Sequence, residues 1–328
     1  DPTFINGGII NSFNSNAQLG KGEYLIAEAD ESDKSFLLLQ PSVSVITNIE
    51  PDHLINYDYS FNNLKGAFLE FIKKLPFNGV SIVCGDDPVI KELKKKFQRP
   101  HISYGFSSSN DYLLSDFRSN GKQSFFKLMS DSESIDFTLN MLGKHNVLNA
   151  AAAAILCLQE GISIEIIQDS LRKFEGIDRR MQILGERQVN NNHCVYIDDY
   201  GHHPTEIEKT IEAIRDSYSG YKIKMVFQPH RFTRTHDLFD EFVDVLGAVD
   251  QLLLLEIYSA GEKAIEGINS SNIKKSLHNS GFNNVELLLN NEVVIGQLGQ
   301  NIDSDTVFIF QGAGNISSIS NAIKKEIS

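Results

Sequence analysis

Cysteine is scarce in this 328-residue sequence, and no two cysteines form a C-x-x-C pair. The three that occur, Cys84, Cys157 and Cys194, lie in apolar segments, and their number is odd. Cysteine-based zinc sites and dithiol redox centres have closely spaced cysteines, and a disulfide framework needs an even set. The pattern is typical of buried free thiols in a reducing compartment.

Long apolar runs are missing as well. The longest, the alanine-rich Ala150–Leu158, is about half as long as a membrane span requires. The first residues, D-P-T-F-I-N-G-G-I-I, have neither the basic region nor the long apolar region of a signal peptide. The sequence therefore predicts a cytoplasmic protein without a membrane partner.

Positive charge is in deficit, with 30 Lys and Arg against 43 Asp and Glu and a net charge of −13. So acidic a chain is poorly suited to nucleic acid or to an anionic membrane, and neither is expected as a partner. Two arginine clusters stand out against this background, Arg179 with Arg180 and Arg231 with Arg234. Each cluster therefore calls for a structural or functional explanation.

The length favours two domains, and the first half alternates between strand and helix patterns. Predicted strands occupy Tyr24–Asp30, Val43–Ile49 and Val80–Cys84, and predicted helices occupy Ser60–Lys74, the D-D-P-V-I-K-E-L segment, His145–Glu160 and Ser163–Phe174. Between His101 and Met141 short strands alternate with turn residues, which predicts an antiparallel extension of the sheet.

Beyond G-I-D-R-R, near residue 176, strands alternate regularly with helices. The predicted strands are Val195–Asp198, Ile223–Phe227, Leu252–Ile257, Val285–Leu289 and Val307–Phe310. Such alternation predicts a parallel, doubly wound sheet. We therefore predict an α/β protein with domains at 1–176 and 177–328. The first is mostly parallel with the antiparallel extension, and the second is Rossmann-like.

Ligands of open α/β sheets bind where the strands end, so the residues there carry the function. The first strand ends in A-E-A-D-E-S-D, which contains Glu28, and the second in T-N-I-E-P-D-H-L, which contains His53. Carboxylates and an imidazole from neighbouring strands could hold Mg²⁺ beside a nucleotide phosphate. Acids that cap helices, with a surface histidine, explain the same pattern, and spacing alone does not decide.

The segment L-G-K-H-N-V-L-N-A opens a predicted helix. Asn146 and Asn149 are three residues apart and share one helix face, where paired amides can read the edge of an adenine. Gly143 would let the ring approach the backbone. A plain helix start capped by asparagine is the alternative.

The segment V-Y-I-D-D-Y-G-H-H-P-T-E is more unusual, because a buried strand runs into two aspartates, a tyrosine and two histidines. These residue types suggest zinc at first glance. However, adjacent histidines rarely ligate one ion, and neither a cysteine nor an H-x₃-H partner is present. We interpret the segment as a substrate-positioning loop.

The segment V-F-Q-P-H-R-F-T-R-T places His230, Arg231 and Arg234 at another strand end. The planar guanidinium suits carboxylate or phosphate, so this group predicts an anion pocket in an otherwise acidic chain. A structural ion pair of Arg234 with Asp237 or Asp240 is the alternative. The last strand runs into Q-G-A-G, which is either an anion-tolerant turn facing the cleft or a plain connection, and we favour the plain connection.

Together, A-E-A-D-E-S-D, T-N-I-E-P-D-H, G-K-H-N-V-L-N-A, D-D-Y-G-H-H-P-T-E and Q-P-H-R-F-T-R-T resemble the Mur ligase family of peptidoglycan synthesis. The last two motifs favour the alanine-adding member over those that add other amino acids or recycle murein tripeptide. The resemblance implies a central ATP-binding domain and a C-terminal amino-acid-binding domain. It also implies that ATP and Mg²⁺ drive the ligation of L-alanine to the carboxylate of UDP-N-acetylmuramate through an acyl phosphate.

The resemblance further implies residue roles. Mg²⁺ would be bound by Glu28 and His53. ATP would be bound by His145, Asn146, Asn149, Arg180 and Asp199. The substrates would be bound by Tyr200, His202, His203, His230, Arg231 and Arg234. The catalytic residues would be His202, His230, Arg231 and Arg180, and the choice of proton acceptor between the two histidines stays open.

One family feature has no counterpart here, since the pattern G-x-x-x-x-G-K-[ST] does not occur and neither does a UDP-binding domain. Gly143-Lys144 is followed by His145, and Gly20-Lys21 by Gly22. We expect the chain to begin inside the central domain and not to turn over by itself. A pseudo-ligase or binding module and the related murein tripeptide ligase are alternatives, and no oligomeric state is predicted.

Overall fold

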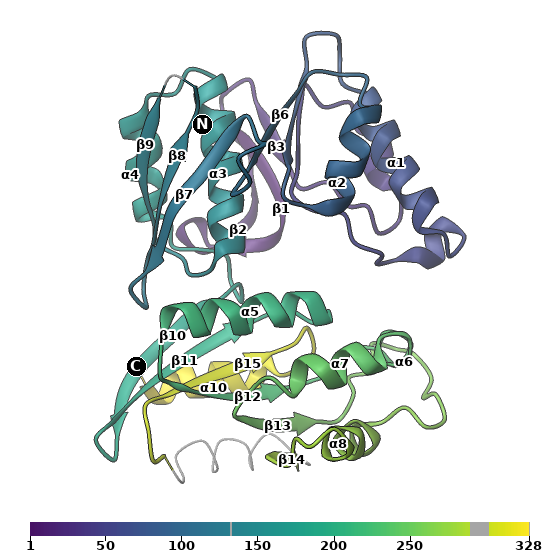
Figure 1. The fold of residues 1–328 in the computed structure, drawn as a ribbon, viewed down its shortest axis with the longest axis vertical. Helices are drawn as coiled ribbons and strands as arrows, with labels where there is room; N and C mark the ends of the chain where they lie inside the picture. Colours follow the sequence, from purple (N-terminus) through teal and green to yellow (C-terminus); the bar gives the residue numbers. More distant parts are fainter. Residues whose placement is uncertain (132, 289–301, 328) are drawn as a thin grey trace. The chain divides into compact units, whose positions relative to one another are not determined.

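The computed structural model describes residues 1–131, 133–288 and 302–327 (Figure 1). It divides into two compact units, Asp1–Glu175 and Gly176–Ser328, which we name the N-terminal and C-terminal units. Each unit combines helices with a largely parallel sheet, so the predicted α/β class is confirmed. The assignment of ATP to one unit and of the amino acid to the other stays a prediction.

The main sheet of the N-terminal unit has the order β4-β5-β6-β7-β8-β9. Its strands are β4 (Val43–Ile46), β5 (Val80–Cys84), β6 (His101–Gly105), β7 (Tyr112–Ser119), β8 (Ser124–Met129) and β9 (Ser134–Leu139). The strands from β4 to β7 pair in parallel, whereas β7, β8 and β9 pair antiparallel. The predicted antiparallel extension is therefore confirmed for the last three strands, while β6 belongs to the parallel part.

Two of the four described helices of this unit begin at a residue whose side chain caps them, Ser60 and Asp87. The helices are α1 (Phe61–Lys73), α2 (Pro88–Leu93), α3 (Lys144–Gln159) and α4 (Ile164–Lys173), with short 3₁₀ turns η1 (Asn11–Phe13), η2 (Ser35–Leu38), η3 (Leu54–Tyr57) and η4 (Lys94–Lys96). The Asp87 side chain accepts a hydrogen bond from Ile90 N at 2.7 Å, which satisfies a free N–H of the first turn of α2. Within the described residues, no helix has both the length and the apolar character needed to cross a membrane.

A second, three-stranded sheet of the order β2-β1-β3 departs from prediction. It consists of β1 (Thr3–Ile10), β2 (Ser15–Gln18) and β3 (Leu25–Ala27). The predicted buried strand Tyr24–Asp30 is wrong in length and in burial, since Leu25 is 61% exposed and Ile26 57%. β3 lies at the edge of this sheet and pairs with β1, so its apolar run is not enclosed on both sides.

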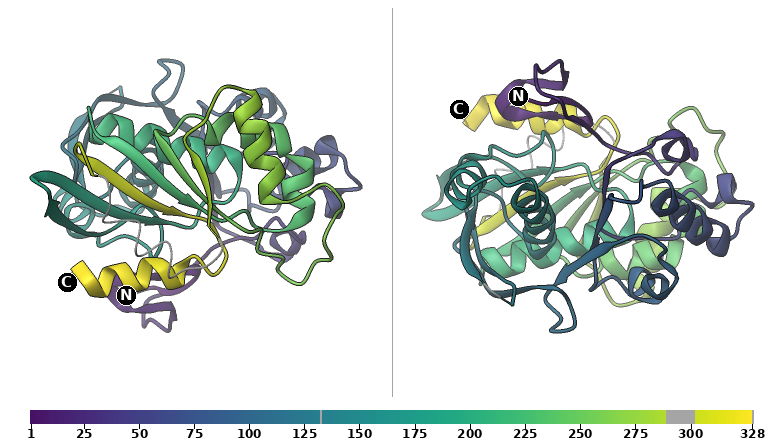
Figure 2. Two further views of the ribbon diagram at one scale, coloured as in Figure 1. Left: turned by 90° about the horizontal axis from the view of Figure 1, so that it is seen from below. Right: turned by 90° about the horizontal axis from the view of Figure 1, so that it is seen from above.

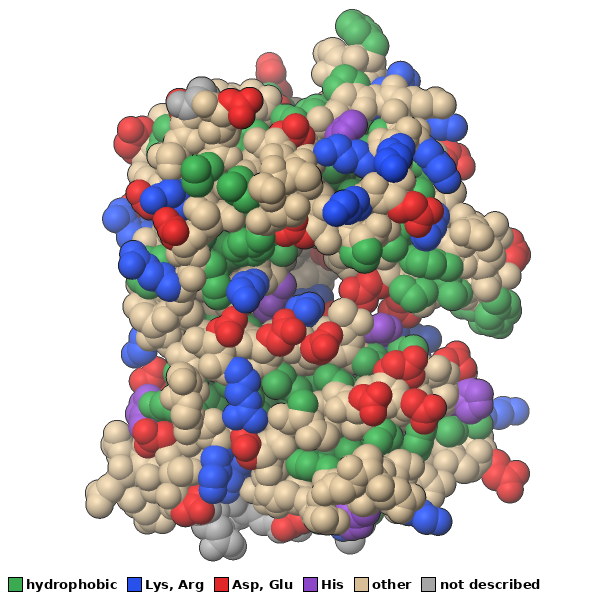
Figure 3. All heavy atoms as spheres, viewed as in Figure 1, with side chains coloured by type: hydrophobic (Ala, Val, Ile, Leu, Met, Phe, Trp, Pro, Cys, Tyr) green, Lys and Arg blue, Asp and Glu red, His purple; other side chains and the backbone are tan. Residues whose placement is uncertain are grey.

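A local basic surface also departs from the acidic average. Lys94, Lys95 and Lys96 form η4 directly after α2, which carries Lys91. Figure 3 shows Lys and Arg side chains gathering over α2 on this face of the N-terminal unit. Net charge alone therefore does not describe the local potential of the surface.

The sheet of the C-terminal unit has the order β10-β11-β15-β12-β13-β14. Its strands are β10 (Gln182–Val189), β11 (Asn192–Asp199), β12 (Lys222–Phe227), β13 (Gln251–Leu255), β14 (Val285–Leu288) and β15 (Thr306–Gln311). All neighbours are parallel except β10 and β11, so the predicted Rossmann-like sheet is confirmed with one added antiparallel edge. The predicted strand Val285–Leu289 is confirmed to Leu288, and Leu289 lies outside the described residues.

Helices cover both faces of this sheet. They are α5 (Pro204–Ser217), α6 (Phe232–Asp237), α7 (Phe239–Leu246), α8 (Ser270–Asn279) and α10 (Ser317–Ile327). α5 contacts α7 and α7 contacts α8, whereas α10 packs against β10, β11 and β15. Figure 2 shows α10 on the sheet face opposite these other helices, and the central strand β15 is buried throughout its length.

Candidate functional site

The carboxyl ends of β11, β12, β13 and β15 meet at one edge of the C-terminal sheet, because these strands are parallel. Backbone hydrogen bonds join the segments that follow them. Gly312 N donates to Asp199 O at 3.0 Å, and Gln228 N donates to Gln311 O at 3.1 Å. The structure thus brings the D-D-Y-G-H-H and P-H-R-F-T-R segments, far apart in sequence, to the same edge.

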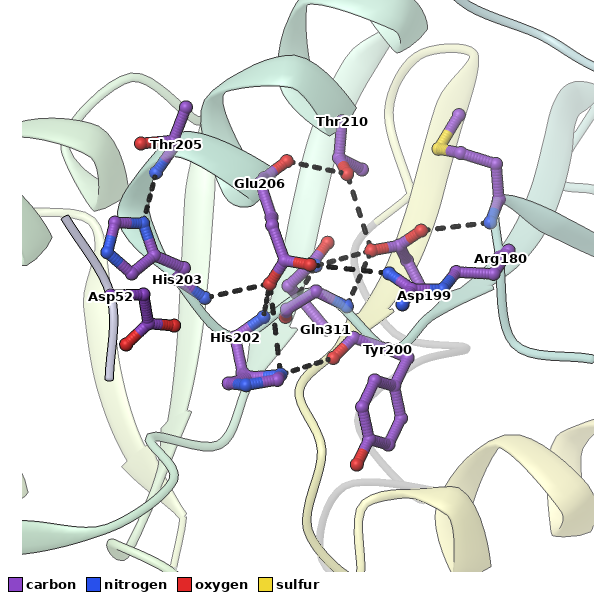
Figure 4. Close-up of polar contacts among 12 residues, drawn as sticks. Asp52, Arg180, Asp199, Tyr200, His202, His203, Thr205, Glu206, Thr210 and Gln311 are labelled. Carbon is purple, nitrogen blue, oxygen red and sulfur yellow. Dashed lines mark hydrogen bonds and ion pairs between the residues drawn. The ribbon is translucent and has the colours of Figure 1, made fainter. Parts of the chain in front are cut away.

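Asp199 is a buried junction between several elements (Figure 4). Its carboxylate accepts hydrogen bonds from Met181 N at 2.9 Å, Gly201 N at 2.8 Å and Gln311 Nε2 at 2.7 Å. These bonds tie the start of the unit to the loop after β11 and to β15. The predicted contact of Asp199 with ATP stays a prediction, and a nucleotide would have to share oxygens that already bind the fold.

Glu206 holds the two histidines of the loop. Its Oε2 accepts hydrogen bonds from His202 N at 2.8 Å and from His203 N at 3.1 Å, while His203 is the N-cap of α5. Burial works against its charge, but the nearby His202 and the N–H donors outweigh burial and hold the pKa of Glu206 below its usual range. The loop is therefore fixed by a capping box before any substrate arrives (Figure 4).

The two arginines of the first cluster have different surroundings. Arg179 is mostly buried, lies 3.4 Å from the buried Asp198 carboxylate and donates to Gly312 O. Arg180 has 48% of its side chain exposed and lies 3.3 Å from Glu206. Both guanidinium groups face the Tyr200 ring, at 5.1 Å and 5.6 Å from its centroid. Arg179 is thus built into the fold, whereas about half of the Arg180 side chain stays exposed, and its predicted contact with phosphates stays a prediction.

His230 follows β12 and is packed between other rings. Its imidazole stacks on Tyr258, with centroids 5.6 Å apart and planes at 12°, and the His202 ring lies 5.5 Å away. Burial lowers the pKa of His230 to about 4, and the charges of His202, Arg234 and Arg231 add to the effect. Its Nδ1 is buried and makes no hydrogen bond within the described residues. The structure thus keeps one neutral imidazole beside two arginines.

We expect His230 to stay neutral down to a pH of about 4. A base whose pKa is lowered by folding stabilises the fold above its ordinary pKa of 6.5, and this contribution is lost as the pH falls toward about 4. Imidazole ¹H–¹⁵N NMR spectra, assigned with His230→Gln, should show no titration of this ring between roughly pH 5.5 and 8. A midpoint inside that range would contradict the burial argument.

Arg231 and Arg234 lie on the short helix α6. Arg231 is its N-cap, has a positive φ of 73°, and keeps 52% of its side chain exposed. Its Nη1 lies 3.8 Å from Oε1 of Glu262. Arg234 lies about one turn later in the helix, and its positive charge contributes to the low pKa of His230.

Two residues of this site escaped the sequence analysis, Tyr258 and Glu262. Both follow β13, in the segment E-I-Y-S-A-G-E. The rule that ligands bind at strand ends was applied to the neighbouring strands, and it would have found this segment too. Gln311 was likewise passed over as part of a plain connection, although its amide binds Asp199 and Gly201 O.

The predicted metal ligands lie in the N-terminal unit. The Glu28 carboxylate accepts a hydrogen bond from Gly7 N at 2.5 Å, and His53 has a positive φ of 53° at the start of η3. Among the described residues, no three or more His, Cys, Asp or Glu side chains are arranged to hold a metal ion. Mg²⁺ commonly takes one or two protein ligands and completes its shell with water and phosphate, so Glu28 still fits such an ion.

The predicted adenine-binding residues lie at the start of α3. Gly143 is the N-cap with a positive φ of 93°, and Asn146 Nδ2 donates to Leu142 O at 2.8 Å. Asn146 therefore does not cap the helix, because it donates to a carbonyl instead of accepting from an N–H. His145 and Asn149 lie on the same helix, and the adenine contact of all three stays a prediction.

Comparisons with known proteins cover most of the chain. Residues 9–157 match the Mur ligase middle domain, and residues 179–314 match the glutamate ligase domain of Mur ligases. The UDP-N-acetylmuramate–alanine ligase of Thermotoga maritima aligns with 99% of the chain and 68% of its own length, at 25% identity and a TM-score of 0.79. The chain thus spans about two thirds of that relative.

Two further structures show the same fold. The murein peptide ligase of Psychrobacter arcticus aligns with 100% of the chain and 72% of its own length, at 20% identity and a TM-score of 0.65. A MurF ligase from Thermotoga maritima, solved in complex with ADP, aligns with 94% of the chain and 69% of its own length, at 18% identity and a TM-score of 0.73.

Proposed function

Because the chain belongs to the Mur ligase family, we propose that it carries the middle and C-terminal parts of an ATP-dependent ligase. The ligase joins L-alanine to the lactyl carboxylate of UDP-N-acetylmuramate in the cytoplasm. The similarity to the alanine ligase of Thermotoga maritima supports this choice of substrates. The carboxylate is activated as an acyl phosphate, which the amine of alanine then attacks.

The observation that carries the proposal is the cationic wall formed by His230, Arg231 and Arg234. A neutral imidazole and two guanidinium groups gather at one strand end of a chain whose net charge is −13. Arginine binds carboxylates through a planar fork, and fixed cations lower a barrier that arises largely from repulsion between anions. A small amino acid is the kind of ligand that this wall suits.

The proposal also assigns roles to the residues predicted to bind Mg²⁺, ATP and the substrate. Glu28 and His53 would hold Mg²⁺, while His145, Asn146 and Asn149 would hold the adenine of ATP. When bound, ATP would supply the phosphoryl group, and Mg²⁺ would offset the negative charge of its phosphates. The exposed guanidinium of Arg180 would contact the phosphates, and the loop from Tyr200 to His203 would position the substrate.

The test is phosphate release with ATP, Mg²⁺, UDP-N-acetylmuramate and one amino acid at a time. Two preparations are compared, the intact protein isolated from its own cell and the 328-residue polypeptide. We expect L-alanine-dependent release, with the ligated product seen by mass spectrometry, from the intact protein. We expect none from the polypeptide alone, because its sequence contains no G-x-x-x-x-G-K-[ST] pattern to cradle the β- and γ-phosphates.

Other outcomes would change the proposal. Release that depends on murein tripeptide and not on alanine would assign the protein to the recycling ligase. Alanine-dependent turnover by the polypeptide alone would show that the missing pattern is dispensable. No turnover by the intact protein with any amino acid would favour a binding module.

A further inference from the structure

The segment after β13 is joined to the segment after β12 by its backbone. Arg231 N donates to Tyr258 O at 2.8 Å, and Tyr258 N donates to Pro229 O at 2.9 Å. The stacked rings of Tyr258 and His230 extend this contact to the side chains. The segment from Tyr258 to Glu262 is therefore a second wall beside His230 and Arg231.

Glu262 is held in this wall by well-defined contacts. Its Oε2 accepts from Thr233 N at 3.0 Å, its Oε1 accepts from Thr233 Oγ at 2.8 Å, and Oε1 lies 3.8 Å from Arg231. Burial works against the charge, but the donors of Thr233 and the charge of Arg231 outweigh burial and hold the pKa of Glu262 below its usual range. The ionised carboxylate keeps 21% of its side chain exposed.

This carboxylate has room for another donor. An ionised carboxylate offers about four acceptor positions. Thr233 occupies two of them, and the backbone N–H of Phe232 also donates to this carboxylate, which leaves about one position open. Arg231 adds a single long contact, which leaves most of its own fork unused. A small ligand at Arg231 would therefore meet a cation and an anion held side by side.

The arrangement matters because an amino acid reaches the site as a zwitterion. Two arginines beside a neutral imidazole would attract any small carboxylate and would repel an ammonium group. A fixed carboxylate next to Arg231 attracts the ammonium group. It repels every carboxylate, but only a carboxylate without an amine lacks the compensating attraction. Specificity of this kind needs an attractive and a repulsive element, and Glu262 supplies both.

We propose that Glu262 is a specificity-determining residue that receives the ammonium group of the incoming amino acid, whose carboxylate binds Arg231 and Arg234. This inference rests on the proposed function and adds the basis of selection to it. The neighbouring charges of Arg231 and Glu262 would then distinguish α-amino acids from simple carboxylates of the same size.

The test compares L-alanine with propionate, which has the same carboxylate and carbon count but no amine. Steady-state kinetics of the intact protein give the KM for alanine and the inhibition constant for propionate against alanine. In Glu262→Gln we expect the alanine KM to rise about 5-fold and the propionate inhibition constant to fall, since a charge-assisted contact and a repulsion are both lost. The amide still accepts from Thr233, so α6 keeps its partner.

Two matched variants separate charge from structure. Glu266→Gln removes the same charge from an exposed position four residues after Glu262 and should change neither constant. Thr233→Val removes one hydrogen bond to Glu262 but keeps its charge, so the ratio of the two constants should stay near that of the unaltered protein. Movement of both constants in the same direction in Glu262→Gln would indicate a merely structural role and would overturn the inference. Absence of alanine-dependent turnover in the unaltered protein would overturn the proposed function itself, and this inference with it.

Discussion

Replacing Arg179 with alanine is expected to lower the free energy of unfolding of the C-terminal unit by about 3 to 5 kcal/mol. The guanidinium lies 3.4 Å from Asp198, whose side chain is only 4% exposed, and it donates to Gly312 O. Without it, the buried carboxylate keeps Ser320 as a hydrogen-bond donor but loses its counter-charge. Urea unfolding of the variant followed by circular dichroism measures the loss.

The loss of stability in Arg179→Ala should become smaller as the pH falls. Burial raises the pKa of Asp198, and Arg179 and Ser320 offset burial only in part. An acid whose pKa is raised by folding binds its proton more tightly in the folded state. Its stabilising contribution is therefore present at low pH and is lost as the pH rises through the folded pKa. Removing Arg179 raises that pKa further, so the deficit should shrink on acidification.

Two variants test the cause of this loss. Adding Asp198→Asn to Arg179→Ala removes the uncompensated charge and should restore part of the stability. Lys209→Ala breaks an exposed ion pair of 2.9 Å with Glu212 and should cost less than about 1 kcal/mol. An Arg179→Ala protein as stable as Lys209→Ala would refute a structural role for the Arg179–Asp198 pair.

Replacing Arg231 with alanine in the intact protein is expected to raise the KM for L-alanine and to lower kcat/KM at least about 10-fold. The guanidinium is the exposed cation of the wall, and Glu262 engages it by only one contact of 3.8 Å. Its loss removes a charge-assisted contact with the substrate carboxylate. Lysine at this position should recover only part of the loss, because an ammonium lacks the planar fork.

A control variant at a distant arginine shows whether the effect on alanine kinetics is specific to Arg231. Arg172→Ala removes an exposed guanidinium that pairs with Asp169 on α4, and alanine kinetics should not change. The KM for ATP should be unaffected in Arg231→Ala, since the predicted nucleotide contacts lie elsewhere. Alanine kinetics that stay the same in Arg231→Ala would remove this residue from the site.

The fold was predictable where burial is uniform. β5 has the bounds predicted for it, Val80–Cys84, because its apolar residues are enclosed on both faces and glycines flank them. β10 was missed, since its polar residues and Gly185 give no strand pattern and its partner β11 supplies the pairing. β3 shows the opposite failure, because an apolar run does not reveal whether anything covers it.

The site was predictable as far as the strand-end rule was followed. That rule found the loops after β11 and β12, and the fold brings them together. It could not show that Arg179 is buried and Arg180 exposed, because neighbouring residues of one type differ only in what packs on them. Glu262 meets Thr233 only because β13 lies beside β12, a fact of tertiary structure.

The position of β15 has a consequence for synthesis of the protein. The strand follows all the other described strands in sequence, yet it lies between β11 and β12 near the middle of its sheet. Until the ribosome releases it, those two strands have no shared neighbour, and Asp199 lacks the amide of Gln311. The candidate site therefore forms late in synthesis. Until then, β11 and β12 each present an unpaired edge, which chaperones or another chain could occupy.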